Sequence, residues 1–274
     1  MTIFSCEDSV DGIFTAVYDA WDSGLGLRNV TVQTGENQNY QLFADYRQVE
    51  TDHDKAAKVA DTIRDKMGME DYEILYQAAL SHSLDKGEVI FGTMVLGLAV
   101  LKQKNITRNL REPCVMRVFE LARAVQTEAH HYRMFVRLKE LDDPRPHYED
   151  CISARQMEAD WEQGIMFCEI EPKHQVLSLL GDHFSDRFPG MNFMIYDRTH
   201  RDCLVHRSCM RWVILQDVTL EEEMVHRYSE KEREYARLWK GFVNSIAIEE
   251  RKNPRCQMNF MPKKYWKYMT EFME

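Results

Sequence analysis

Residues 2–33 have the sequence TIFSCEDSVDGIFTAVYDAWDSGLGLRNVTVQ. The first five form a short apolar run, which predicts a strand over Thr2–Cys6. From Val10 to Trp21, apolar residues recur at helical spacing, and Asn29–Gln33 has the pattern of a second strand. A strand, a helix and a strand within about thirty residues predict a small βαβ unit at the start of the chain.

A long helix is predicted further along, because Pro113 suits a first helical turn and an apolar stripe continues from there to about Lys139. Strand patterns return afterwards, around a helix from about Gln175 to Phe184. These strands are expected at Ile165–Ile170, Asn192–Tyr196, Leu204–His206 and Trp212–Leu215, with a hairpin turn at Asp197–Asp202. The last part is helical, with an expected buried stripe of Tyr235, Trp239, Phe242, Val243 and Ile246.

This order of elements predicts an α+β fold and not a doubly wound sheet. We expect an N-terminal βαβ unit, central helices, a small mixed or antiparallel sheet and C-terminal helices. The 274 residues are expected to form one domain, residues 1–274, and a division into two lobes stays open. The lobes would be residues 1–140, the βαβ unit with the helices, and residues 163–274, the sheet with the C-terminal helices. Residues 141–162 are polar and predict a loop or insertion.

Composition excludes several classes of protein. The chain has 35 Lys and Arg against 45 Asp and Glu, a net charge of -10, so a generic coat for duplex DNA is not expected. The 7 cysteines include no C-x-x-C pair, which argues against a zinc ribbon, an iron–sulfur cluster and a disulfide framework. No secretory signal and no membrane span are visible, so a cytoplasmic protein is expected.

The most pointed local motif is Glu128-Ala129-His130-His131-Tyr132-Arg133 on the long helix. His130, Arg133 and Arg137 are three or four residues apart on one edge of the apolar face, where they could hold a phosphate. On the opposite flank, Glu128 and His131 have the Glu-x-x-His spacing of carboxylate metal sites. The alternative is a helix flank whose charges pair with neighbouring elements.

Two other segments carry polar clusters. His183 and Arg187 lie near the end of the predicted helix of the strand-rich part, and Asp197 and His206 follow on the hairpin. They could form a site near strand ends, or the first two could simply stabilise a helix C-terminus.

The C-terminal segment has no acidic residue from Arg251 to Tyr268. Its cations alternate with aromatic residues, a mixture that suits single-stranded or flipped-out nucleic acid, because cations follow phosphates and rings stack on bases. The residues concerned are Arg251, Lys252, Arg255, Lys263, Lys264, Tyr265, Trp266 and Lys267. The alternative is a basic tail that docks on acidic groups of the same protein.

Several segments together resemble a bacterial family called "probable DNA metabolism protein", a domain of unknown function numbered 4130. The matching segments are Cys6-Glu7-Asp8-Ser9, Tyr18-Asp19-Ala20-Trp21, Val118-Phe119-Glu120-Leu121, Glu128-Ala129-His130-His131, Glu171-Pro172, Asp186-Arg187-Phe188-Pro189, Ile246-Ala247-Ile248-Glu249-Glu250-Arg251-Lys252-Asn253-Pro254, Met261-Pro262 and Met269-Thr270-Glu271-Phe272. The resemblance implies a role in DNA repair or DNA metabolism beside a radical-SAM protein encoded nearby, since relatives also occur fused to uracil-DNA-glycosylase-like domains. It implies no established reaction.

We therefore expect a protein that binds DNA, single-stranded or damaged, and acts with a radical-SAM partner. Two alternatives stay open: a non-catalytic subunit that presents substrate to that partner, and a metal-dependent nuclease or base-processing enzyme. The candidate catalytic residues are Glu128, His130, His131 and His183. The candidate nucleic-acid-binding residues are Arg133, Arg137, Arg187 and the eight tail residues named above. The sequence assigns no metal ligand and no cofactor.

Overall fold

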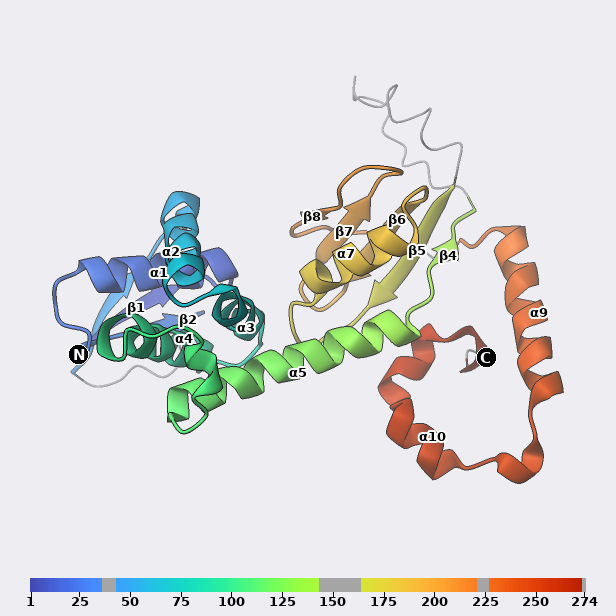
Figure 1. The fold of residues 1–274 in the computed structure, drawn as a ribbon. Coiled ribbons are helices and arrows are strands. Elements are labelled where there is room, and N and C mark those ends of the chain that lie inside the picture. The colour runs from blue at the N-terminus through green and yellow to red at the C-terminus, as the bar shows by residue number, and fades with distance from the viewer. Residues whose placement is uncertain (36–42, 143–163, 221–226, 273–274) are drawn as a thin grey trace, which may run out of the picture. The chain divides into compact units, whose positions relative to one another are not determined.

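The computed structural model describes residues 1–35, 43–142, 164–220 and 227–272 (Figure 1). Its chain divides into an N-terminal unit, Met1–Thr127 with Lys173–Gln175, and a C-terminal unit, Glu128–Pro172 with Val176–Glu274. Both units combine helices with a small sheet, so the α+β class is confirmed. The division falls inside a helix and not in the predicted loop at 141–162, most of which lies outside the described residues.

The N-terminal unit has a parallel sheet with β1 (Thr2–Cys6) between β2 (Val30–Thr34) and β3 (Asp45–Gln48). Helix α1 (Val10–Asp22) connects β1 to β2, which confirms the predicted βαβ unit. The third strand was not predicted, because its sequence DYRQ is polar and its side chains are largely exposed. Pairing with β1 places it in the sheet without any hydrophobic pattern of its own.

Helices make up the rest of this unit, and their apolar stripes meet in one core that includes Ile63, Met67 and Leu75, each 0% exposed. They are α2 (His53–Lys66), α3 (Met69–Ala79), α4 (Lys86–Val95), the π-helical turn η1 (Leu96–Val100), the 3-10 turn η2 (Ile106–Arg108) and the start of α5 (Pro113–Phe135).

Local chemistry fixes the turn after β1. The Ser9 hydroxyl caps α1 by accepting a hydrogen bond from the Gly12 N–H at 3.0 Å. A β-carbon at Gly12 would lie 2.6 Å from the Glu7 carbonyl oxygen, so the close approach of the turn to the helix requires glycine.

The C-terminal unit has a five-stranded mixed sheet in the order β4-β5-β6-β7-β8, in which only β5 and β6 are parallel. Helix α7 (Leu177–Arg187) makes the crossover between these two strands and lies across one face of the sheet (Figure 1). The strands are β4 (Lys139–Glu140), β5 (Ile165–Ile170), β6 (Asn192–Asp197), β7 (Asp202–His206) and β8 (Val213–Leu215). The predicted strands and hairpin turn are confirmed within one or two residues.

The long helix α5 ends at Phe135, earlier than the predicted end near Lys139. Lys139 and Glu140 instead pair with Phe167 and Met166 of β5 as an edge strand. The apolar periodicity alone could not show this, because the pairing depends on a strand far along the chain.

After the sheet come α9 (Glu230–Ile246), η3 (Glu249–Arg251), α10 (Pro254–Phe260), η4 (Lys263–Tyr268) and η5 (Thr270–Phe272). The predicted helix over α9 is confirmed, but its expected buried stripe is wrong. Tyr235, Phe242 and Ile246 are more than half exposed, at 58%, 52% and 58%, and α9 has no buried residue. Among the helices of the described residues, none is both long and apolar enough to cross a bilayer.

A buried carboxylate organises the connection that follows α4. Asp71 on α3 is 0% exposed and accepts hydrogen bonds from the backbone N–H groups of Ile106 and Thr107, at 3.0 and 3.1 Å, and from the Thr107 hydroxyl at 2.6 Å. These donors would otherwise be buried without a partner, so one side chain fixes the whole turn at η2.

We expect Asp71→Ala to lower the free energy of unfolding by about 3 kcal/mol, because it leaves buried donors unsatisfied. Chemical denaturation measures the change. The matched control is Glu70→Gln, on the same helix as Asp71. It weakens an exposed ion pair with Arg108 of η2 and is expected to leave stability unchanged. Equal effects of the two substitutions would contradict the assignment.

Candidate nucleic-acid interface

The end of α5 and the turn η4 meet in the C-terminal unit through a charge pair and a cluster of rings. Glu128 is 6% exposed, and its Oε1 lies 3.0 Å from the Lys264 Nζ. The fully buried Tyr265 ring packs against the rings of His131, Tyr132 and Phe135, with centroid separations of 5.1, 5.2 and 5.5 Å. The Glu-x-x-His pair of the sequence therefore faces the protein's own C-terminal segment.

His183 belongs to a different cluster, with Arg133. The Arg133 Nη2 donates a hydrogen bond to the Leu179 carbonyl oxygen on α7, and its buried Nε has no hydrogen-bond partner among the described residues. The pKa of His183 is lowered, first by burial and then by the nearby charges of Arg133 and Arg187. The structure thus brings His183 and Arg133 together. His130 lies on α5 directly before His131, and its side chain is exposed.

His206 is accounted for by the core of the sheet. Its Nδ1 lies 3.0 Å from the Met191 carbonyl oxygen, and its ring stacks on Phe193 with centroids 4.6 Å apart. A pocket shared by His206 with His130 or His131 is not seen among the described residues.

The tail residues divide into docked and exposed groups. Lys264 pairs with Glu128 and Lys267 with Glu171, while Tyr265 is buried. Trp266 stacks on Phe272, with ring centroids 4.5 Å apart, and its Nε1 donates to the Met261 carbonyl oxygen. The contacts of these residues fit the alternative interpretation, in which the basic tail docks on acidic groups of the same protein. Arg251, Lys252, Arg255 and Lys263 are exposed.

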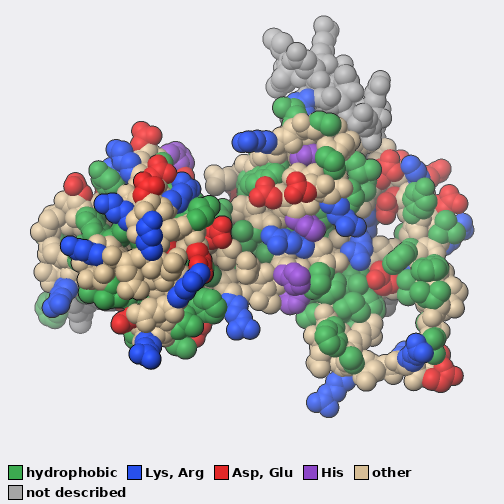
Figure 2. All heavy atoms as spheres, in the orientation of Figure 1, with side chains coloured by type: hydrophobic (Ala, Val, Ile, Leu, Met, Phe, Trp, Pro, Cys, Tyr) green, Lys and Arg blue, Asp and Glu red, His purple; other side chains and the backbone are tan. Residues whose placement is uncertain are grey.

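Exposed aromatic side chains accompany these exposed cations. On α9, Tyr235, Trp239 and Phe242 are 58%, 43% and 52% exposed, and Phe260 at the end of α10 is 74% exposed. Trp239 and Phe242 form a ring pair, and the Trp239 Nε1 donates to Glu271, which orients that ring. Figure 2 shows hydrophobic side chains on the visible face of this region, beside acidic and basic ones.

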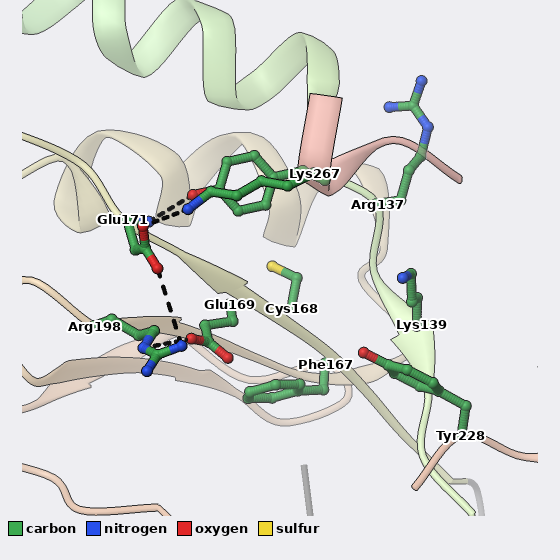
Figure 3. Close-up of a pocket in the computed structure, with 10 residues that line it drawn as sticks. Arg137, Lys139, Phe167, Cys168, Glu169, Glu171, Arg198, Tyr228 and Lys267 are labelled. Carbon is green, nitrogen blue, oxygen red and sulfur yellow. Dashed lines mark hydrogen bonds and ion pairs between the residues drawn. The ribbon is translucent and has the colours of Figure 1, made fainter. Parts of the chain in front are cut away.

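A charged pocket of about 190 Å³ lies at the carboxyl end of the parallel strand pair (Figure 3). Glu171 directly follows β5 and Arg198 directly follows β6, so both side chains leave the same edge of the sheet. The Arg198 Nε lies 2.8 Å from Glu169, and Lys267 of η4 pairs with Glu171. In α/β sheets the carboxyl edge of parallel strands is the usual place for a ligand.

The remaining wall of this pocket includes Arg137, between α5 and β4, Lys139 of β4, and Tyr228, two residues before the start of α9. Arg137 donates through Nη1 to the Met134 and Val136 carbonyl oxygens at the end of α5. The Lys139 Nζ lies 4.9 Å from the centre of the Tyr228 ring. Of the predicted residues, the pocket gathers Arg137 and Lys267.

A family comparison matches residues 84–271, from the start of α4 almost to the end of η5, to DUF4130, a domain of unknown function. The chain belongs to the DUF4130 family. The matched region includes every residue of the two clusters, the pocket and the tail described above. A search of curated proteins found no match to the chain.

Sequence reasoning missed most of the lining of this DUF4130 pocket, including Lys139, Glu169, Arg198 and Tyr228. A usable signal was present for two of them: Glu169 lies in a predicted strand and Arg198 follows another, and parallel pairing would bring such positions to one edge. Tyr228 carried no such signal. Glu128 pairs with Lys264 and His131 packs on Tyr265, and among the described residues no group of three or more His, Cys, Asp and Glu side chains could hold a metal ion.

The two clusters predict how stability depends on pH. The pKa of His131 is lowered by burial and by the charges of Lys264 and His130, and that of His183 is lowered as described above. Below a pH of about 6.5 the unfolded chain binds protons that the folded chain resists, so stability is lost as the pH falls.

We expect the thermal melting temperature to fall between pH 7 and pH 5.5, approximately, and the fall to be smaller in His131→Gln with His183→Gln. Differential scanning calorimetry across this range measures it. A double variant whose melting temperature depends on pH as steeply as the wild type's would contradict the argument.

Proposed function

We propose that this chain binds single-stranded nucleic acid, in DNA metabolism, through α9 and the exposed part of the C-terminal segment that follows it. The observation that carries the proposal is the set of exposed rings on α9 and α10 beside the acid-free run that begins at Arg251. Bases stack on exposed aromatic side chains, and cations neutralise the phosphates between them. If these rings served only to pack α9 against the core of the protein, they would be buried.

The role in DNA metabolism is what the family resemblance implies, and we extend it to this chain together with a radical-SAM partner. The enzyme version gives His131 or His183 the part of an acid or base, since a lowered pKa leaves an imidazole neutral and able to accept a proton near pH 7. The binding version leaves the chemistry to the partner. In both versions the C-terminal segment holds the strand.

We expect Trp239→Ala with Phe242→Ala to weaken binding to single-stranded DNA by about tenfold or more, because stacking contributes about 1–3 kcal/mol per base. Replacing Arg251, Lys252 and Arg255 by Gln is expected to flatten the dependence of affinity on salt. Fluorescence anisotropy at several salt concentrations measures both effects.

The matched control is Phe43→Ala, which removes a 99% exposed aromatic ring from the N-terminal unit. Affinity that is unchanged in the α9 variant, or equally reduced in the control, would reject the α9 rings as the binding surface.

The second candidate function is a subunit that presents substrate to the radical-SAM partner. It is favoured by exposed aliphatic residues on α9 and directly after it, namely Leu238, Ile246 and Ile248, at 55%, 58% and 48% exposure. Such side chains suit a protein surface better than a base. Co-purification with the radical-SAM protein, followed by activity assays of each protein alone and together, separates the two functions. Loss of co-purification in Leu238→Ser with Ile246→Ser would support this candidate, and retained co-purification would oppose it.

A further inference from the structure

The charged pocket at the carboxyl end of β5 and β6 has an excess of positive charge. The described residues that line it include four cations, Arg137, Lys139, Arg198 and Lys267, and two acids, Glu169 and Glu171. Glu169 pairs with Arg198, and Glu171 with Lys267 and with Arg198 (Figure 3). The lining as a whole therefore carries an excess of two positive charges, in a chain whose net charge is -10.

Lys139 brings part of this excess into a desolvated position. Its ammonium group lies over the Tyr228 ring, and burial lowers its pKa. Two charges outside the lining also act on it with opposite signs, since Glu232 favours the charged form and Lys240 opposes it. An anion in the pocket would stabilise the charged form of Lys139.

The pocket is small, and hydrogen bonds hold parts of its wall. Its volume of about 190 Å³ lies below the roughly 300–1,000 Å³ of pockets for drug-sized molecules, so it suits a small polar group and not a whole nucleotide. One wall is the strand pair, and another is held in place by Tyr268, whose hydroxyl accepts a hydrogen bond from the Glu171 N–H at 2.9 Å. Arg137 stands at the rim, where its guanidinium donates to backbone carbonyl oxygens and points away from the other lining side chains (Figure 3).

We propose that this pocket binds a phosphomonoester dianion, and that its source in the proposed function is the terminal phosphate of a nucleic-acid strand. A phosphomonoester carries a charge of about −1.5 to −2 at pH 7, which matches the excess in the pocket. A phosphodiester inside a strand carries a single negative charge and has a sugar on both sides. The pocket therefore distinguishes a strand end from the interior of a strand. The nucleic-acid source rests on the proposed function, whereas the phosphate site does not.

The test compares one short single-stranded DNA sequence with a 5′-phosphate, with a 3′-phosphate and with hydroxyl groups at both ends. Anisotropy gives the affinity of the full chain for each, and calorimetric titration with inorganic phosphate and deoxyadenosine monophosphate tests the free sources. The variants are Lys139→Gln and the charge-keeping Lys139→Arg. Lys231→Gln is the matched control, because it removes an exposed lysine of α9 outside the pocket.

We expect one of the end-phosphorylated strands to bind about tenfold tighter than the hydroxyl strand, as a charge-assisted contact would give. This ratio is expected to fall to about one in Lys139→Gln and to persist in Lys139→Arg and Lys231→Gln. Should Lys139→Gln fail to fold, as judged by its melting curve, Arg137→Gln replaces it and is expected to lower the ratio in the same direction.

The other outcomes separate this inference from the proposed function. Equal binding of all three strands, with no binding of the free phosphates, overturns the pocket and leaves strand binding intact. Binding of a free phosphate that Lys139→Gln abolishes, without binding of any strand, supports the phosphate site and overturns its nucleic-acid source. Binding of neither strands nor free phosphates overturns both.

Discussion

A carboxylate that is withdrawn from water needs a cation or hydrogen-bond donors close by, and Glu128 meets this requirement with Lys264. The pair joins the end of α5 to a turn that lies far along the chain, and Tyr265 adds a fully buried ring beside it. Lys267 and Tyr268 follow in the same turn, so the contact that anchors η4 also places them against Glu171. The charged pocket exists because this segment is docked.

Docking also decides which cations remain available. Lys264 and Lys267 neutralise acids of their own unit, and their aromatic neighbours Tyr265 and Trp266 pack inside it. In the run from Arg251 to Lys263, Lys252 pairs only with its exposed neighbour Glu249 among the described residues, and the rings of α9 stay exposed. A single basic-aromatic stretch of sequence thus supplies a structural anchor at one end and an accessible surface at the other, a division that no residue pattern within it displays.

Local patterns predicted the elements well and their partners poorly. The strands Thr2–Cys6 and Ile165–Ile170 followed from apolar runs, but β3 and β4 are polar and form only because a neighbouring strand offers its edge. The stripe of α9 has the period of a buried helix, yet periodicity records amphipathicity and not what covers it. The sequence drew attention to Glu128 and His131 by their spacing, while the residues that contact them, Lys264 and Tyr265, lie far along the chain, beyond the reach of local spacing.

The overall charge limits how such a protein could meet a polyanion. A net charge of -10 repels nucleic acid at long range, but salt screens this field within about 10 Å. Attraction must then come from cations that touch the strand, and the exposed run and the pocket are two places where cations outnumber acids. Contacts at close range select a geometry, because only a strand whose phosphates and bases match these positions makes contacts favourable enough to offset the electrostatic repulsion. A local excess of positive charge on an acidic chain therefore favours selective binding over coating.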